Sequence, residues 1–143
     1  MPWLICVVAS ASSWGADTLS PAARPALSEA ERQAGWKLLF DGSTAAGWRG
    51  LGMEGFPHSR WEVRDGCLHC FGGPGRTNDL ITERKYEDFE LTFEWMIRKD
   101  LGNSGVKYRV EEKKGDGYIA LQDHHDEVYF RNLKLRELVA DGR

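Results

Sequence analysis

The clearest pattern along the chain is the alternation of apolar and polar residues over Phe89–Ile97 (FELTFEWMI). Successive side chains of a β-strand point to opposite faces, so a period of two predicts a strand with one face in a core. The same period returns in residues 104–110, after the polar, glycine-containing segment 98–103. We therefore expect the two segments to pair as an antiparallel hairpin whose apolar faces share one core.

Shorter segments of this kind, punctuated by glycine, follow one another along most of the chain. They lie at residues 36–40, 61–63, 67–71, 118–122 and 128–138. Asp65-Gly66 favours a tight hairpin between the second and third of them, and the last two are expected to pair with each other. The alternation of apolar and polar residues shifts by one position at Asn132-Leu133, which predicts a β-bulge. About seven short strands and one helix indicate an all-β antiparallel sandwich.

The helix is expected just before the first strand. Ser28 is followed three residues later by Glu31, which is the spacing of a capping box, and Gly35 favours the end of the helix. Residues 17–27 contain Pro21 and Pro25 among small residues, as is typical of a linker. We therefore assign residues 17–33 to a linker and short helix, and residues 34–143 to the β-sandwich domain.

The first sixteen residues have the pattern of a secretory signal peptide. An apolar run at residues 3–9 precedes small-residue cleavage sites after Ala11 and Ala16, although no Lys or Arg comes before the run. The run is too short to span a bilayer as a helix. We expect an exported protein, periplasmic or extracellular, with its signal peptide at residues 1–16; the alternative is a frayed N-terminal tail.

Composition narrows the functional classes. The 143 residues fit one domain, and an apolar share of 41% argues against a disordered chain. The formal net charge of −3 argues against a nucleic-acid partner. Three cysteines cannot form a multi-disulfide framework. Cys67 and Cys70 should point to opposite faces of one strand, so we expect one to be buried and the other exposed.

Several short motifs occur in a fixed order between about residues 34 and 138. They are LLFDG at 38–42 with Gly47-Trp48, WEVRDG at 61–66, LIT at 80–82 with YEDFEL at 86–91, GNSGV at 102–106 with Arg109, GYIALQDH at 117–124 and VYFRNL at 128–133. This set resembles the 3-keto-disaccharide hydrolase domain family. The resemblance implies a concanavalin A-like jelly roll in a secreted bacterial protein that acts on carbohydrate.

The resemblance also implies two departures from the family. Family members usually continue through a long segment with further strands after the strand that ends at Val110, whereas here residues 111–116 lead almost directly into the next strand. We therefore expect a shortened jelly roll. The family's usual His-Gly turn reads His124-His125 in this chain. A histidine accepts a positive φ more readily than most residues, although less readily than glycine.

The reaction implied by the resemblance is cleavage of a glycosidic bond near a C3 ketone. A base removes the acidified C2 hydrogen, the glycosidic oxygen leaves C1, and water adds afterwards. His124 is the candidate base, because it matches the family's histidine. Arg109 is the candidate stabiliser of the enediolate anion. A divalent metal ion is a further candidate for that role, with no residue assigned as its ligand.

Candidate contacts with the sugar come partly from the expected hairpin. One allowed register places Glu94 opposite Lys107 and Arg109 opposite Thr92, which gives a polar face suited to binding hydroxyl groups. The alternative is a solvated face with ordinary ion pairs.

Three further residues are candidates for substrate binding. Asn103 lies in a turn that borders the pocket in the family, and Gln122 lies in the motif that ends at His124. Trp48, beside glycines in an expected loop, is the candidate for stacking on a sugar ring. The DHHDE run at 123–127 contains metal-ligand types, but consecutive residues of a turn rarely converge on one ion, and a polar turn is the alternative.

Two other functions stay open at this point. The first is a non-catalytic sugar-binding module, and the second is an inactive, truncated member of the family. In each case the expected partner is a carbohydrate, with no nucleic acid and no membrane span.

Overall fold

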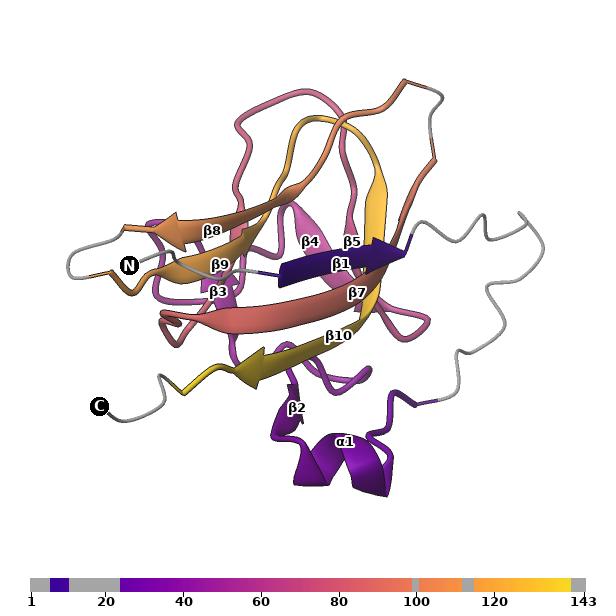
Figure 1. Cartoon of the computed structure of the whole chain (residues 1–143). Helices are drawn as coiled ribbons and strands as arrows, with labels where there is room; N and C mark the ends of the chain where they lie inside the picture. The colour runs from indigo at the N-terminus through magenta and orange to yellow at the C-terminus, as the bar shows by residue number, and fades with distance from the viewer. Residues whose placement is uncertain (1–5, 11–23, 99–100, 112–114, 140–143) are drawn as a thin grey trace.

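Two β-sheets pack against each other to form the body of the structure (Figure 1). The computed structural model describes residues 6–10, 24–98, 101–111 and 115–139. The elements in these ranges are β1 (Cys6–Ser10), α1 (Glu29–Gln33), β2 (Trp36–Leu38), β3 (Trp48–Gly50), β4 (Trp61–Arg64), β5 (Cys67–Cys70), β6 (Leu80–Thr82), β7 (Phe89–Ile97), β8 (Val106–Val110), β9 (Tyr118–Leu121) and β10 (Val128–Glu137). The all-β expectation is confirmed, while the short strands β3 and β6 were not predicted from the pattern.

Sheet A has the strand order β1-β7-β10-β5-β4, with β2 also paired to β10. Sheet B has the order β3-β6-β9-β8. All described pairs are antiparallel except that of β1 with β7. The register of β10 against β7 shifts between Arg131 and Lys134, and Asn132 has a φ of 51°, which confirms the predicted bulge. The result is a jelly-roll-like β-sandwich, as the sequence indicated.

The predicted hairpin of β7 and β8 is wrong, because the two strands belong to different sheets. β7 pairs with β10, so that Glu94 lies opposite Arg131, and β8 pairs with β9. The predicted pairing of β9 with β10 fails in the same way. Alternation shows that each strand has one face in a core. Two strands can each bury one face either as paired strands of one sheet or as strands of opposite sheets that face each other across the core. Alternation alone therefore does not distinguish the two arrangements.

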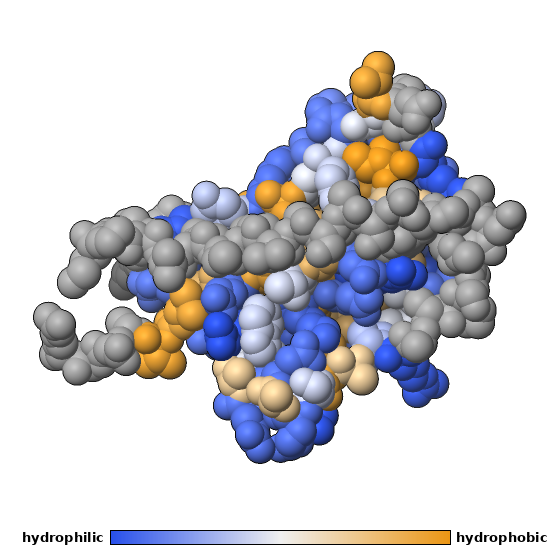
Figure 2. Space-filling view, turned by 45° about the vertical axis from the view of Figure 1, so that its right-hand side comes forward, coloured by the Kyte–Doolittle hydropathy of each residue, from blue (hydrophilic) through white to orange (hydrophobic). Residues whose placement is uncertain are grey.

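The core between the sheets is filled by large aromatic and aliphatic side chains. Its largest fully buried members include Trp48, Trp61, Phe40, Phe89 and Phe130. The indole N–H of Trp48 donates to the carbonyl oxygen of Leu39, and that of Trp61 donates to the carbonyl oxygen of Asn78, both at 2.8 Å. These bonds let both rings be buried with their polar atoms satisfied. On the face seen in Figure 2, apolar groups lie between larger areas of hydrophilic surface.

The local predictions for the helix and the first hairpin are confirmed. The hydroxyl oxygen of Ser28 accepts from the Glu31 N–H at 3.1 Å, and the Glu31 carboxylate accepts from the Ser28 N–H at 2.7 Å. Gly35 takes a φ of +87° at the end of α1. Between β4 and β5, Asp65 and Gly66 have φ values of 50° and 75°, as a type I′ turn requires.

The expected signal peptide contains one described element. β1 runs parallel to β7, from Cys6 opposite Glu90 to Ser10 opposite Glu94. The rest of residues 1–16, and residues 17–23 of the expected linker, lie outside the described residues. No helix in the described part of the chain has the length and apolarity needed to cross a bilayer.

Cys67 and Cys70 are both free and fully buried, so the expectation that one would be exposed is wrong. β5 lies between β4 and β10, and all four of its residues are buried, so its outer face is covered as well as its core face. Burial raises the pKa of Cys67 to about 11 and that of Cys70 to about 12. Both groups are therefore neutral thiols at physiological pH, and a neutral thiol is a poor nucleophile.

We expect the two thiols to be protected in the native protein. In a Cys6→Ser variant at about pH 8, a thiol reagent such as DTNB should label neither cysteine until guanidinium unfolds the chain, and should then label both. Rapid labelling of the native variant would contradict the burial of β5.

Candidate functional site

A polar cleft of about 540 Å³ lies on the outer face of sheet B. Its walls come from Leu51, Lys107 and residues 76–79 and 122–125. The cleft owes its polar floor to strand alternation: Val106, Leu80 and Leu121 pack in or against the core. Their neighbours Lys107, Asp79 and Gln122 therefore point to the opposite face, where the cleft opens.

An ion pair fixes the ammonium group of Lys107 at the cleft wall. Its Nζ donates to Asp79 Oδ2 at 2.7 Å, while Asp79 Oδ1 accepts from the backbone N–H of Asp123 at 3.0 Å. The Lys107 side chain is 47% exposed. An ammonium has three N–H donors, so Lys107 keeps donors for a ligand while Asp79 holds it in place.

A buried salt bridge holds the back of the cleft together. Arg60 donates from Nε to Asp123 Oδ2 at 2.6 Å and from Nη2 to Asp123 Oδ1 at 2.8 Å. The Asp123 side chain is fully buried, and its Oδ2 also accepts from the Asn78 N–H at 3.0 Å. Burial by itself would raise the pKa of Asp123, but the hydrogen bonds from Arg60 and the Asn78 N–H outweigh it and hold the pKa below its usual value. Both carboxylate oxygens of Asp123 are therefore bound within the protein, so Asp123 stabilises the cleft and does not contact a ligand.

The same arginine anchors the glycine-rich loop before β6. Arg60 Nη1 donates to the carbonyl oxygen of Pro74 at 3.2 Å, and the Gly73 N–H donates to the carbonyl oxygen of His125 at 2.7 Å. Gly72 has a φ of +67°, and a Cβ there would lie 2.6 Å from the backbone nitrogen of Glu127. Only glycine allows this close approach of the loop to the turn before β10.

His124 presents its side chain at the cleft. It is exposed, and its imidazole forms no hydrogen bond with another described residue. The next residue, His125, takes the positive φ of 68° that the family's glycine would adopt. Its Nδ1 lies 3.1 Å from the carbonyl oxygen of Gly73. His125 therefore shapes the turn, and His124 is left available to a ligand.

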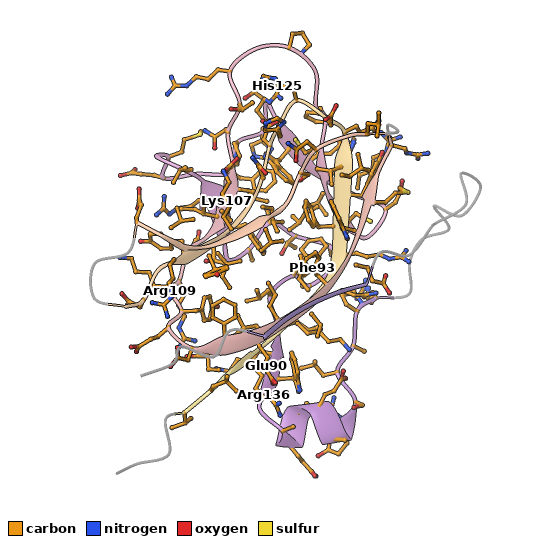
Figure 3. All side chains as sticks on the ribbon, turned by 45° about the horizontal axis from the view of Figure 1, so that its top comes forward. Glu90, Phe93, Lys107, Arg109, His125 and Arg136 are labelled. Atoms are coloured by element: carbon orange, nitrogen blue, oxygen red, sulfur yellow. The ribbon has the colours of Figure 1, made fainter. Side chains whose placement is uncertain are left out.

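The structure brings three of the predicted site residues together and separates the others. His124, Lys107 and Gln122 line the cleft. Arg109 does not; its guanidinium lies 3.7 Å from Asp88, and Figure 3 shows it well away from Lys107 and His125. The register of β8 shifts between Lys107 and Val110, and Arg109 has a φ of 55°. Because of this bulge, Arg109 does not lie on the same face of β8 as Lys107, as it would in a regular strand.

The remaining three candidates lie elsewhere. Glu94 is on the outer face of sheet A, where its Oε2 accepts from Arg131 at 2.6 Å and from Asn132 at 3.0 Å. The backbone N–H of Asn103 donates to Asp126 at 2.7 Å, and Asn103 is not among the cleft residues. Trp48 is only 2% exposed and belongs to the core, so its ring offers no face to a sugar.

The sequence did not point to Asp79, Arg76 or the Arg60–Asp123 pair as parts of the site. Arg60 and Asp123 are 63 residues apart, and no local spacing relates them. Arg76 follows a glycine-proline-glycine run, whose composition indicates only a loop. For a metal, the described ranges contain no group of three or more His, Cys, Asp or Glu side chains able to hold an ion.

The fold and the cleft define a class: jelly-roll-like β-sandwich domains with an open polar site on the outer face of one sheet. The 3-keto-alpha-glucoside-1,2-lyase-like domain model matches residues 35–116, more than half of the sequence. The chain belongs to this family, which confirms the resemblance seen in its motifs.

Two relatives place the chain more closely. It is 39% identical over 97 residues to a 3-keto-disaccharide hydrolase of Bacteroides thetaiotaomicron, an alignment that covers 62% of this chain and 33% of that protein. The chain thus spans about a third of the length of this relative. A crystal structure of a candidate glycosyl hydrolase from Parabacteroides distasonis shares the fold, with a TM-score of 0.62 at 17% identity over 82% of this chain and 100% of the other.

Proposed function

We propose that the chain cleaves the glycosidic bond of a 3-keto-glycoside bound in the cleft. The observation that carries the proposal is that His124, whose imidazole forms no hydrogen bond among the described residues, lines the same cleft as Lys107, whose ammonium Asp79 holds in place. Membership of the family and the relative named as a 3-keto-disaccharide hydrolase support this choice of substrate.

The reaction needs a base and a cation. The imidazole of His124 removes the C2 proton of the sugar, and the electron pair forms an enediolate with the C3 oxygen. The ammonium of Lys107, rather than the more distant Arg109, stabilises the negative charge on that oxygen. The C1–O bond then breaks, and its electrons leave with the glycosidic oxygen, which takes a proton. Water adds across the resulting double bond, so the net change is hydrolysis.

Lys107→Met is expected to lower kcat on a 3-keto-glucoside by about 10²-fold to 10³-fold, because it removes the cation from the developing enediolate. Stability should fall by about 1.5–3 kcal/mol, since Asp79, whose side chain is only 11% exposed, loses a charged hydrogen-bond partner. The measurement is release of the alcohol by the full chain, with the unoxidised glucoside as the negative substrate.

Lys37→Met is the matched control for this experiment. Lys37 also pairs with a carboxylate, Glu137, at 3.6 Å, but it lies on β2 in the other sheet. Its replacement should leave turnover unchanged. Equal turnover by Lys107→Met and the native chain would remove Lys107 from the mechanism.

A non-catalytic sugar-binding domain is the second candidate function. It is favoured by the position of Arg109, the predicted stabiliser of the anion, which lies outside the cleft beside Asp88. Saturable binding of a keto-sugar without turnover by the folded chain would establish it.

We also propose that the protein is exported, on the leader-like pattern of residues 1–16. N-terminal sequencing of the chain recovered outside the cytoplasm tests this. A first residue at position 12 or 17 is the expected result.

A further inference from the structure

Residues 76–78 line both the cleft of His124 and a second cavity, and we propose that this second cavity binds the group released from the sugar. The chemistry of its walls selects a leaving group that combines an apolar ring with a carboxylate. This inference rests on the proposed function, because it assumes that the sugar occupies the first cleft.

The two cavities share a wall. Leu51 and residues 76–78 line both the first cleft, of about 540 Å³, and the second cavity, of about 350 Å³. Each volume lies within the range of about 300–1,000 Å³ that is usual for small-molecule sites. The second cavity is therefore adjacent to the first, and a ligand that lies over residues 76–78 would contact both.

Arg76 supplies the charge at this wall. It is exposed, and it forms no hydrogen bond or ion pair with another described residue. The loop before it is nevertheless held in place, since Arg60 donates to the carbonyl oxygen of Pro74. A guanidinium on an anchored loop can bind a carboxylate through two parallel hydrogen bonds. Arg60 also lines this cavity, but its guanidinium is bound to Asp123, so Arg76 supplies the charge for an anion.

Met53 supplies the apolar surface of the second cavity. It is 41% exposed, and the Asn78 amide Nδ2 lies 3.4 Å from its sulfur. Arg49 holds its backbone by donating to the Met53 carbonyl oxygen at 3.0 Å. A polarisable thioether packs well against an aromatic ring. The cavity therefore offers an aromatic acid both a surface for its ring and a partner for its charge.

The test measures binding by the full chain with a series of 3-keto-glucosides that differ only at the leaving group. Methyl, phenyl and 4-carboxyphenyl glycosides are titrated calorimetrically into the His124→Ala chain, so that binding is measured without cleavage, and 4-hydroxybenzoate is titrated alone. The carboxyphenyl compound is expected to bind at least about fivefold more tightly than the phenyl compound, as for a solvent-accessible ion pair. The phenyl compound should in turn bind more tightly than the methyl compound.

Two variants assign the effect to the cavity. Arg76→Gln should bring the affinity ratio of carboxyphenyl to phenyl close to one, while Met53→Ala should reduce the ratio of phenyl to methyl. Arg64→Gln is the control, because Arg64 is an exposed arginine of β4 that pairs with Glu62 outside both cavities. It should leave both ratios unchanged.

The two proposals can fail separately. Equal binding of the phenyl and carboxyphenyl compounds by the His124→Ala chain, or a preference that survives when Arg76→Gln is added to it, overturns the inference about the second cavity. If no keto-glycoside binds, but 4-hydroxybenzoate binds in an Arg76-dependent manner, the second cavity stands and the proposed function falls. If neither the keto-glycosides nor 4-hydroxybenzoate bind, both are overturned.

Discussion

Arg60→Met should lower the free energy of unfolding by about 3–5 kcal/mol, which is the usual cost of leaving one member of a buried ion pair alone. The variant keeps Asp123 buried but removes both guanidinium hydrogen bonds to it. It also frees the glycine-rich loop that Arg60 holds at Pro74. Urea unfolding of both proteins measures the difference. The back of the cleft depends on this pair, so ligand binding should be lost along with stability.

Arg84→Met is the matched control for this loss. Arg84 lies 2.8 Å from Glu137, but its side chain is exposed, and removal of an exposed pair costs less than about 1 kcal/mol. Similar losses in the two variants would contradict a special role for burial at Arg60.

The same pair sets the expected response to acid. The pKa of Asp123 is lowered in the folded state, so its contribution to stability is complete above the unfolded-state pKa of about 3.9 and is lost as the pH falls through the folded-state value. Once Asp123 is protonated, it has no negative charge for Arg60 to neutralise, so replacement of Arg60 lowers the free energy of unfolding by less. The stability difference between the native chain and Arg60→Met should therefore narrow from about pH 7 to about pH 3. A constant difference would show that Asp123 does not titrate in this range.

His124→Ala is expected to lower kcat on a 3-keto-glycoside by about 10²-fold to 10⁴-fold, which is the usual contribution of a general base. His124 is exposed and has no hydrogen-bond partner among the described residues, so the variant should unfold at the same urea concentration as the native chain. Initial rates with saturating substrate separate this effect from weaker binding.

His58→Ala provides the control for the loss of a surface imidazole. His58 is exposed, and its ring contacts Phe56 outside the cleft. It should retain full turnover. Undiminished turnover in His124→Ala would mean that another group removes the C2 proton. Binding without turnover by the native chain would favour the sugar-binding module.

Most strand positions could be predicted from the sequence, although β1, β3 and β6 were not, and most strand partners could not be predicted. The alternation over Phe89–Ile97 correctly placed β7 and its buried face. It could not distinguish a hairpin with β8 from a chain that crosses to the opposite sheet, because both arrangements bury the same residues. Only the Asp-Gly turn between β4 and β5 carried enough local information to fix a pair.

The residues of the candidate site could likewise be predicted only in part. Lys107, Gln122 and His124 line one cleft, but the predicted register that set Lys107 opposite Glu94 was wrong, since Lys107 pairs with Ala120. Arg109 is two residues beyond Lys107 and would share its face in a regular strand, but the bulge redirects it. Trp48 stands beside glycine in the sequence, yet a short strand carries it into the core. Such outcomes depend on contacts between distant segments, which spacing does not reveal.

The position of β10 affects how the domain is made in the cell. This strand pairs with β2, β5 and β7, and each of these precedes it in the chain. A ribosome must therefore release residues 128–137 before sheet A can close, and until then β5 and β7 lack the neighbour that separates them. Pairings between distant segments form slowly, and unpaired strand edges favour aggregation. The edges of β5 and β7 that face β10 are therefore open to other chains until synthesis has passed β10.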